Sequence, residues 1–139
     1  MTGTDFDDCA RLYVRAMIWI DFDDVFDLRG YHLTAAAAAQ IAEDVDAFLK
    51  VATPLLLAAE EELGTPEIFK RAGEDFFLSR QGYDYGFAGN PELWGAQGAA
   101  LHAFAKDDFC FLYAIADEQN AISFTGVEEW NRYMEAHGE

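Results

Sequence analysis

Negative charge is the feature that most constrains the fold of this chain. Its 139 residues include 26 Asp and Glu against nine Lys and Arg, a formal net charge of −17 at pH 7. Residues 1–70 carry fourteen acids and five bases, and residues 71–139 carry twelve and four, so the excess is not an acidic tail. Because 52% of the residues are hydrophobic, the chain can form a core, and its surface must spread mutually repelling charges over the whole molecule.

The length predicts a single domain that covers residues 1–139, since a chain of this size buries roughly two-thirds of the surface that it exposes when unfolded. Cys9 and Cys110 fall in apolar patterns and are expected to be buried free thiols. The acidic N-terminus has no signal-peptide core, and no stretch reaches the roughly twenty apolar residues of a membrane span. We therefore expect a cytoplasmic protein without membrane contact.

Helix start and stop signals dominate the first half of the chain. Capping residues, prolines and a glycine divide it into segments whose apolar residues recur at helical spacing. The signals are Thr4, Thr34, Thr53-Pro54, Gly64 and Thr65-Pro66. They predict helices over residues 5–20, 35–53, 54–64 and 66–73.

Strand-like patterns appear in the second half. Aromatic residues crowd segments 76–80 and 83–87 on either side of a Gln-Gly turn, which predicts a β-hairpin. Segments 109–116 and 121–124 flank a polar turn and predict a second hairpin.

One helix is expected between the hairpins, because Asn90-Pro91 has the cap-then-proline order of a helix start. Thr125 and Glu128 have the spacing of a capping box, which predicts a C-terminal helix after them. The expected fold class is α+β: N-terminal helices, then a ββαββ antiparallel sheet with helices packed on one face, then the C-terminal helix.

Residues that carry chemistry are few. The acidic loop 21–27 invites a calcium interpretation, but Val25, Phe26 and His32 stand where an EF-hand has ligands and its glycine. The three histidines lack zinc spacing, and no hydroxyl residue lies in a nucleophile motif. We therefore expect no enzyme, no metal and no cofactor.

One segment carries a resemblance to a known family. Residues 72–87 read Ala-Gly-Glu-Asp-Phe-Phe-Leu-Ser-Arg-Gln-Gly-Tyr-Asp-Tyr-Gly-Phe, which resembles the AGxDFxL(T/S)RxGxxxGF segment of a family of small phage and prophage proteins. Glu74 and Tyr83 stand where that family has histidines. The upstream matches are Tyr13, Ala16, Trp19, Asp44 and Phe48. The resemblance implies a bacteriophage protein that acts in the host cell cytoplasm, and it implies no particular activity.

The charge suggests a function for such a viral protein. Direct nucleic acid binding is disfavoured because it depends on Lys and Arg. Carboxylates three or four residues apart on a helix lie about 5–6 Å from each other, a spacing similar to that of successive phosphates. We therefore expect an acidic inhibitor that binds a basic nucleic-acid-binding defence protein of the host, a restriction or CRISPR nuclease complex, by DNA mimicry. The expected partner-binding acids are Asp5, Asp8, Asp21, Asp23, Asp24, Asp27, Glu60, Glu61 and Glu62.

The alternative is a protein-protein interaction module that does not mimic DNA. In that interpretation the aromatic hairpin docks on a partner and the charge serves solubility. Tyr83, Asp84 and Tyr85 form the secondary set of candidate contacts, with Phe76 and Phe87 beside them. The sequence leaves open which patch makes contact, and it leaves the oligomeric state open.

Overall fold

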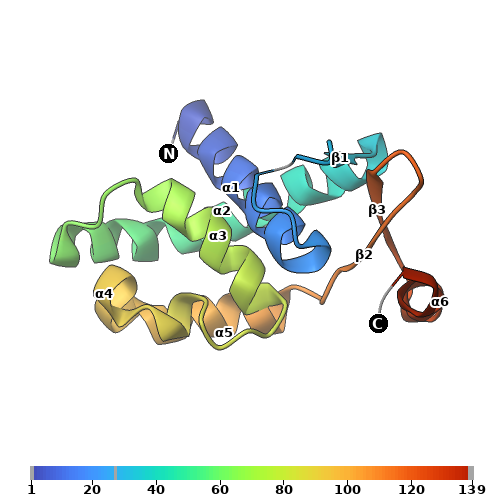
Figure 1. Ribbon diagram of the computed structural model, residues 1–139. Helices are drawn as coiled ribbons and strands as arrows, with labels where there is room; N and C mark the ends of the chain where they lie inside the picture. Colours follow the sequence, from blue (N-terminus) through green and yellow to red (C-terminus); the bar gives the residue numbers. More distant parts are fainter. Residues whose placement is uncertain (1, 27, 138–139) are drawn as a thin grey trace.

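The computed structural model describes residues 2–26 and 28–137. The protein is α+β: helices form the body, and a small three-stranded sheet lies at one end beside the last helix (Figure 1). Two short 3₁₀ turns connect helices in the second half. The elements in chain order are α1 (Gly3–Phe22), β1 (His32–Leu33), α2 (Ala35–Leu63), α3 (Ile68–Arg80), α4 (Pro91–Trp94), α5 (Gly98–Asp108), β2 (Tyr113–Ala116), β3 (Ala121–Thr125) and α6 (Val127–His137).

Local capping signals place the starts of α1 and α2. Thr34 caps α2 as predicted, with its Oγ1 accepting a hydrogen bond from the backbone N–H of Ala37. At α1 the N-cap is Thr2 and not Thr4, because Thr2 and Asp5 exchange both hydrogen bonds of a capping box. Gly64 ends α2 at a φ of 67°, a conformation that glycine adopts without strain.

The predicted break at Thr53-Pro54 is wrong, because α2 continues through it. Proline removes the N–H that would bond the carbonyl of Lys50, but Lys50 and Pro54 both lie on the exposed side, where water can satisfy that carbonyl. The buried stripe of α2 runs unbroken from Val45 to Ala59 on the opposite side. Packing of that stripe outweighs the local cost of the proline.

The predicted first hairpin is also wrong, and with it the ββαββ arrangement. Residues 76–80 lie in α3, and residues 83–87 form turns. All five residues of segment 76–80 are buried, so this part of α3 is packed against other elements on every side. A helix that is buried on every side has a continuous apolar run, which periodicity alone does not distinguish from a buried strand. The prediction that Cys110 is buried is wrong as well, whereas Cys9 is buried as expected.

The sheet contains the predicted second hairpin and one strand from the first half. β2 pairs antiparallel with β3, and β3 pairs in parallel with the two-residue β1. The register places His32 opposite Ala121 and Leu33 opposite Ile122. This mixed sheet joins the segment after α1 to the C-terminal end of the chain.

The closest helix packing joins α1 to α3. A Cβ atom on Gly73 would lie 2.1 Å from the carbonyl oxygen of Cys9, so no larger residue fits without moving one helix. Tyr13 of α1 packs on Phe76 and Phe77 of α3, with ring centroids 5.4 Å apart in each pair. Gly73 therefore sets how near the two helices approach.

A buried ion pair links three helices to the segment before β2. The Arg80 guanidinium donates to the Asp44 carboxylate at 2.7 Å, to the Cys110 carbonyl at 2.7 Å and to the Tyr13 hydroxyl at 3.5 Å. The Cζ carbon of the Arg80 guanidinium lies 5.5 Å from the ring centre of Phe109. The Arg80 side chain is 3% exposed and that of Asp44 13%, so the charges have little solvent to compensate them.

Loss of this pair should be costly. We expect Asp44→Ala to lower the free energy of unfolding by about 3 kcal/mol, because removal of one partner leaves a buried charge uncompensated. The matched control is Asp46→Ala, which breaks the exposed Lys50–Asp46 pair of the same helix and should cost at most about 1 kcal/mol. Urea denaturation of both variants checks this, and equal losses would contradict it.

Candidate functional site

Three of the predicted acids converge. Asp5 and Asp8 from the start of α1 and Glu60 from the end of α2 border one shallow hollow of about 280 Å³, which Glu67 also lines. Glu61 and Glu62 are exposed on the last turn of α2. The fold thus joins two acidic groups that lie more than fifty residues apart in the sequence.

The other acidic group lies at the opposite end of α1. A helix of twenty residues is about 30 Å long, so Asp21 and Asp23 are far from Asp5 and Asp8. Asp24 is buried, and its carboxylate accepts hydrogen bonds from the backbone N–H groups of Leu28 and Arg29, both at 3.1 Å.

Asp24 therefore stabilises the loop after α1 from within, and a partner cannot reach its carboxylate. Asp27 lies outside the described residues, so its placement adds nothing to either acidic group.

The aromatic candidates divide into exposed and buried residues. Tyr83 and Tyr85 lie on the turn after α3 with ring centroids 5.4 Å apart, and Tyr85 and Asp84 are exposed. Phe76 and Phe87 are fully buried and belong to the core. Of this set, only the turn residues can meet a partner.

A serine and a histidine also meet. The Oγ of Ser79 lies 2.9 Å from Nδ1 of His102, and it accepts a hydrogen bond from the backbone N–H of Phe87. Asp75, one turn earlier, instead accepts hydrogen bonds from the Trp94 indole at 2.6 Å and from Asn90 at 3.2 Å. These hydrogen bonds hold the turns after α3 against that helix. Because Ser79 is fully buried, its hydroxyl is not accessible as a nucleophile from solvent.

An open groove follows the junction of α1 and α3. Arg11, Arg15 and Trp19 are four residues apart on α1, so they line one side of that helix. Hollows along the groove join Arg11 with Lys70, and Trp19 with Leu78, so the two helices run in the same direction. We call this feature the α1–α3 groove.

One end of the α1–α3 groove is basic. Four basic and two acidic side chains line a hollow of about 270 Å³ there. Arg11 pairs with Asp8 at 3.4 Å and Lys70 pairs with Glu67 at 3.1 Å. The charged residues of this end are Arg11, Arg15, Lys70, Arg71, Glu67 and Glu74. Four of the nine bases of a strongly acidic chain thus gather in one place.

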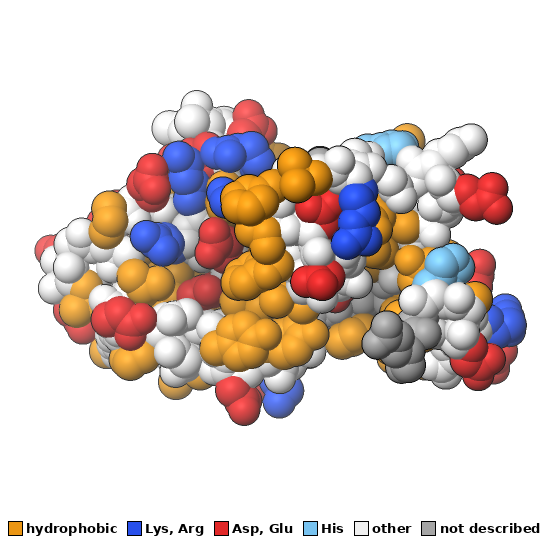
Figure 2. Space-filling model, viewed as in Figure 1, with side chains coloured by type: hydrophobic (Ala, Val, Ile, Leu, Met, Phe, Trp, Pro, Cys, Tyr) orange, Lys and Arg blue, Asp and Glu red, His pale blue; other side chains and the backbone are white. Residues whose placement is uncertain are grey.

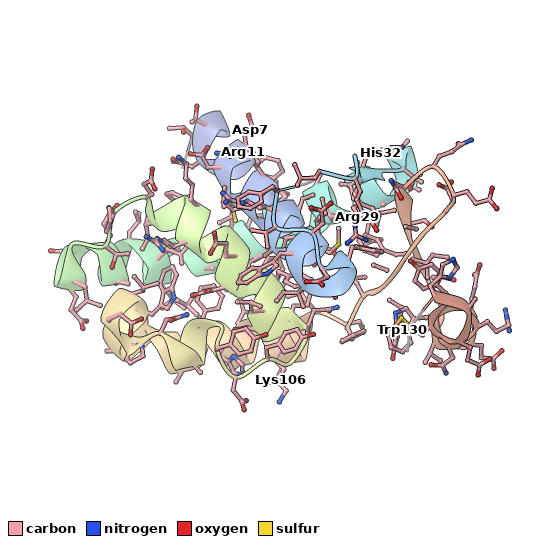
Figure 3. All side chains as sticks on the ribbon, viewed as in Figure 1. Asp7, Arg11, Arg29, His32, Lys106 and Trp130 are labelled. Atoms are coloured by element: carbon pink, nitrogen blue, oxygen red, sulfur yellow. The ribbon has the colours of Figure 1, made fainter. Side chains whose placement is uncertain are left out.

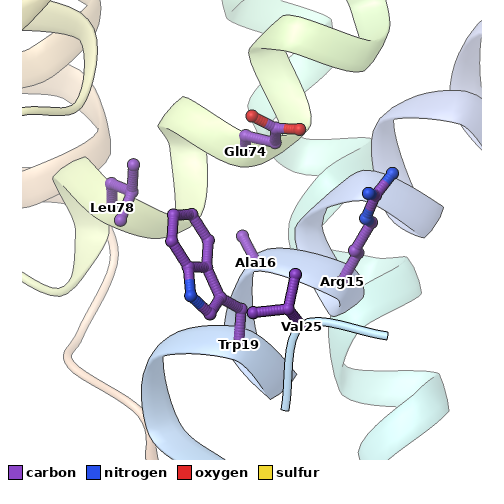
Figure 4. A pocket seen from close by; sticks show the side chains of 6 residues that line it. All are labelled: Arg15, Ala16, Trp19, Val25, Glu74 and Leu78. Atoms are coloured by element: carbon purple, nitrogen blue, oxygen red, sulfur yellow. The ribbon is translucent and has the colours of Figure 1, made fainter. Parts of the chain in front are cut away.

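The other end is apolar. A hollow of about 140 Å³ is bordered by Trp19, Leu78 and Val25, with Ala16 beneath and Arg15 and Glu74 at the rim (Figure 4). Figure 2 shows hydrophobic side chains in a band over the end of α1, the following loop and the end of α3, with Lys and Arg on both sides.

Four exposed residues form what we call the exposed apolar surface. The exposed fractions are 49% for Trp19, 44% for Val25, 75% for Phe26 and 84% for Leu28. The surface thus continues from the apolar end of the groove onto the loop after α1.

Sequence reasoning missed this groove. The signal that could have found its α1 side is Trp19, a large aromatic residue that does not belong to the apolar series from Cys9 to Ile20 and shares a helix face with two arginines. On the α3 side, Lys70 and Arg71 lie in the predicted helix 66–73, but the strand predicted for segment 76–80 does not place Leu78 on the same helix.

No family model matches this chain, and no curated protein or solved structure is significantly similar to it. Within residues 2–26 and 28–137, no three His, Cys, Asp or Glu side chains gather in a way that could hold a metal ion. In the same residues, no helix combines the length and apolar character needed to cross a membrane. Function has to be inferred from the residues of this chain.

Asp75 should make stability depend on pH. Burial is the largest cause that raises the pKa of Asp75 from 3.8 to about 6, although Trp94 and Asn90 stabilise its charge. The folded protein then holds a proton that the unfolded chain releases, so stability falls as pH rises from about 4 through 6, by about 3 kcal/mol in all.

Asp75→Asn should remove this fall, because the amide oxygen can still accept from Trp94 and the side chain does not titrate. Urea denaturation from pH 4 to 7.5 measures the difference between the two proteins. Parallel stability profiles would show that Asp75 titrates normally.

Proposed function

We propose that this chain is a protein-binding module whose docking surface is the α1–α3 groove together with the exposed apolar surface. The observation that carries the proposal is the exposure of Trp19, Val25, Phe26 and Leu28 at the end of α1 and in the loop that follows it. Contiguous exposed apolar groups mark interaction sites in soluble proteins, and aromatic residues commonly anchor protein interfaces.

The rigidity of the surroundings supports this surface. Trp19 projects from a twenty-residue helix that packs closely on α3, where Gly73 lies against Cys9. A site built on packed helices keeps its geometry before binding, which lowers the entropic cost of association. The high negative charge elsewhere keeps a protein with such a surface from self-association and aggregation.

Substitutions on the exposed apolar surface should weaken partner binding without unfolding the protein. We expect Trp19→Ala and Phe26→Ser each to weaken the complex with a partner retained from the host by at least tenfold. The control is Val51→Ser, since Val51 is an equally exposed apolar residue that lies on α2. Calorimetry measures the three affinities, and circular dichroism checks the fold.

Retention of full affinity by both surface variants would contradict the proposal. So would an equal loss in the Val51→Ser control. The apolar contact should also persist at 1 M salt, where the Debye length is only about 3 Å.

A second candidate function is inhibition of a basic nucleic-acid-binding defence protein of the host by mimicry of DNA charge. The convergence of Asp5, Asp8, Glu60 and Glu67 around one hollow favours it. Those carboxylates come from two helices and the turn between α2 and α3, so they form a fixed acidic group that a cationic groove could receive.

Mimicry predicts competition with DNA. Asp8→Asn, Glu60→Gln and Glu67→Gln together should reduce displacement of labelled DNA from the retained partner by at least tenfold. The charge-matched control changes Glu118, Glu128 and Glu135 to Gln at the other end of the molecule, and all three are exposed. If the protein binds alongside DNA, or if both triple variants behave alike, mimicry at this hollow is excluded.

A further inference from the structure

The basic and apolar ends of the α1–α3 groove form one continuous surface. Arg15 and Glu74 line both hollows, so a ligand that fills the apolar end lies directly beside the basic end. The side chains of Arg15 and Trp19 are one helical turn apart, about 5–6 Å between Cβ atoms. A ligand of two or three extended residues can therefore touch both.

The basic end is suited to carboxylates. Arg15 and Arg71 form no ion pair with any residue in the described ranges, whereas Arg11 pairs with Asp8 and Lys70 pairs with Glu67. Guanidinium groups bind carboxylates through two parallel hydrogen bonds. Four bases face three acids when Asp8, the partner of Arg11, is counted with Glu67 and Glu74, so this end keeps a positive excess in a protein of net charge −17.

The apolar end is suited to one large side chain. A cavity of about 150 Å³ lined by apolar side chains can hold benzene, and the hollow beside Trp19 has a volume of about 140 Å³. The indole and Leu78 supply apolar walls for a leucine or phenylalanine side chain.

We propose that the α1–α3 groove binds a short acidic segment of a partner protein, with its carboxylates on Arg15 and Arg71 and one bulky apolar side chain against Trp19 and Leu78. This inference rests on the proposed function and adds the chemistry of the partner. Charge complementarity selects an acidic segment, because a basic one would be drawn to the carboxylates that cover the rest of the surface. Nucleic acid fits less well, since its affinity comes from many phosphate contacts over an extended basic surface.

A peptide probe tests the chemistry. The probe is a fluorescein-labelled peptide that contains Glu-Asp-Glu-Gly-Leu-Gly, and its binding is followed by fluorescence anisotropy. We expect binding at least tenfold tighter than for a peptide with Lys in place of the acids, and tenfold tighter than for one with Ala in place of Leu. Equal binding of the three peptides would overturn the proposal.

A pair of charge-matched variants tests whether the probe binds at the basic end of the α1–α3 groove. Arg15→Glu with Arg71→Glu should weaken probe binding at least tenfold. The control, Lys106→Glu with Arg132→Glu, makes the same change in net charge at exposed residues of α5 and α6. Its affinity for the probe should stay within twofold of that of the unmodified protein. Figure 3 shows Lys106 at the opposite edge of the molecule from Arg11. If the first variant loses its circular dichroism spectrum, Arg15→Gln replaces it with the same expectation.

The remaining outcomes identify a different occupant. A second copy could insert its own exposed residues Asp23, Val25 and Phe26, and sedimentation would then show a dimer that Arg15→Glu dissociates. Labelled single-stranded DNA that binds more tightly than the probe would identify a nucleic acid site. Either result overturns the proposal. If Trp19→Ala still abolishes capture of the partner while the probe fails to bind, the docking surface stands and only the partner chemistry is wrong.

Discussion

The buried guanidinium of Arg80 is the interaction on which the rest of the structure depends. Its acceptors come from α1, α2 and the segment before β2, so a single side chain fixes three parts of the chain against the end of α3. A buried charge of this kind is tolerated only when its hydrogen bonds are satisfied together. Gln81 extends the same junction, because its amide exchanges two hydrogen bonds with the backbone of Leu112. The end of α3 thereby holds the sheet end of the molecule in place, and with it the orientation of α3 beside α1.

Charge is distributed unevenly in this protein, although the sequence spreads its acids evenly. Arg80 is used inside the structure, and four of the remaining eight bases line one end of the α1–α3 groove. Some acids are also used internally: Asp24 holds its loop and Asp75 accepts from the Trp94 indole. The rest of the surface carries the other four bases, Arg29, Lys50, Lys106 and Arg132, among a much larger number of acids. An extreme net charge can therefore coexist with a locally positive groove, and net charge alone does not identify the partner.

The sequence predicts well what is decided locally. The Thr34 cap, the Gly64 stop, the start of α4 at Pro91 and the β2–β3 hairpin follow from neighbouring residues, and the structure contains all four. Local patterns predict the wrong structure for segment 76–80, because distant contacts decide whether it is a strand or a helix. Its polar residues Ser79 and Arg80 find partners 8 to 67 positions away, and no local pattern reports such partners. Continuation of α2 through Pro54 has the same origin, since burial of a stripe on the far side outweighs a local helix-breaking signal.

The candidate site could be predicted only in part for a related reason. A run such as Glu60 to Glu62 is visible in a sequence, but its approach to Asp5 and Asp8 requires the fold. The α1–α3 groove is less visible still, because its sides are helices more than forty residues apart that meet where Gly73 lies against Cys9. The close contact of Gly73 with Cys9 sets the distance between α1 and α3, and thereby also the spacing of Trp19 and Leu78 in the groove. A change in the width of the groove would therefore disturb the packing at Gly73, so the core imposes the shape of this surface.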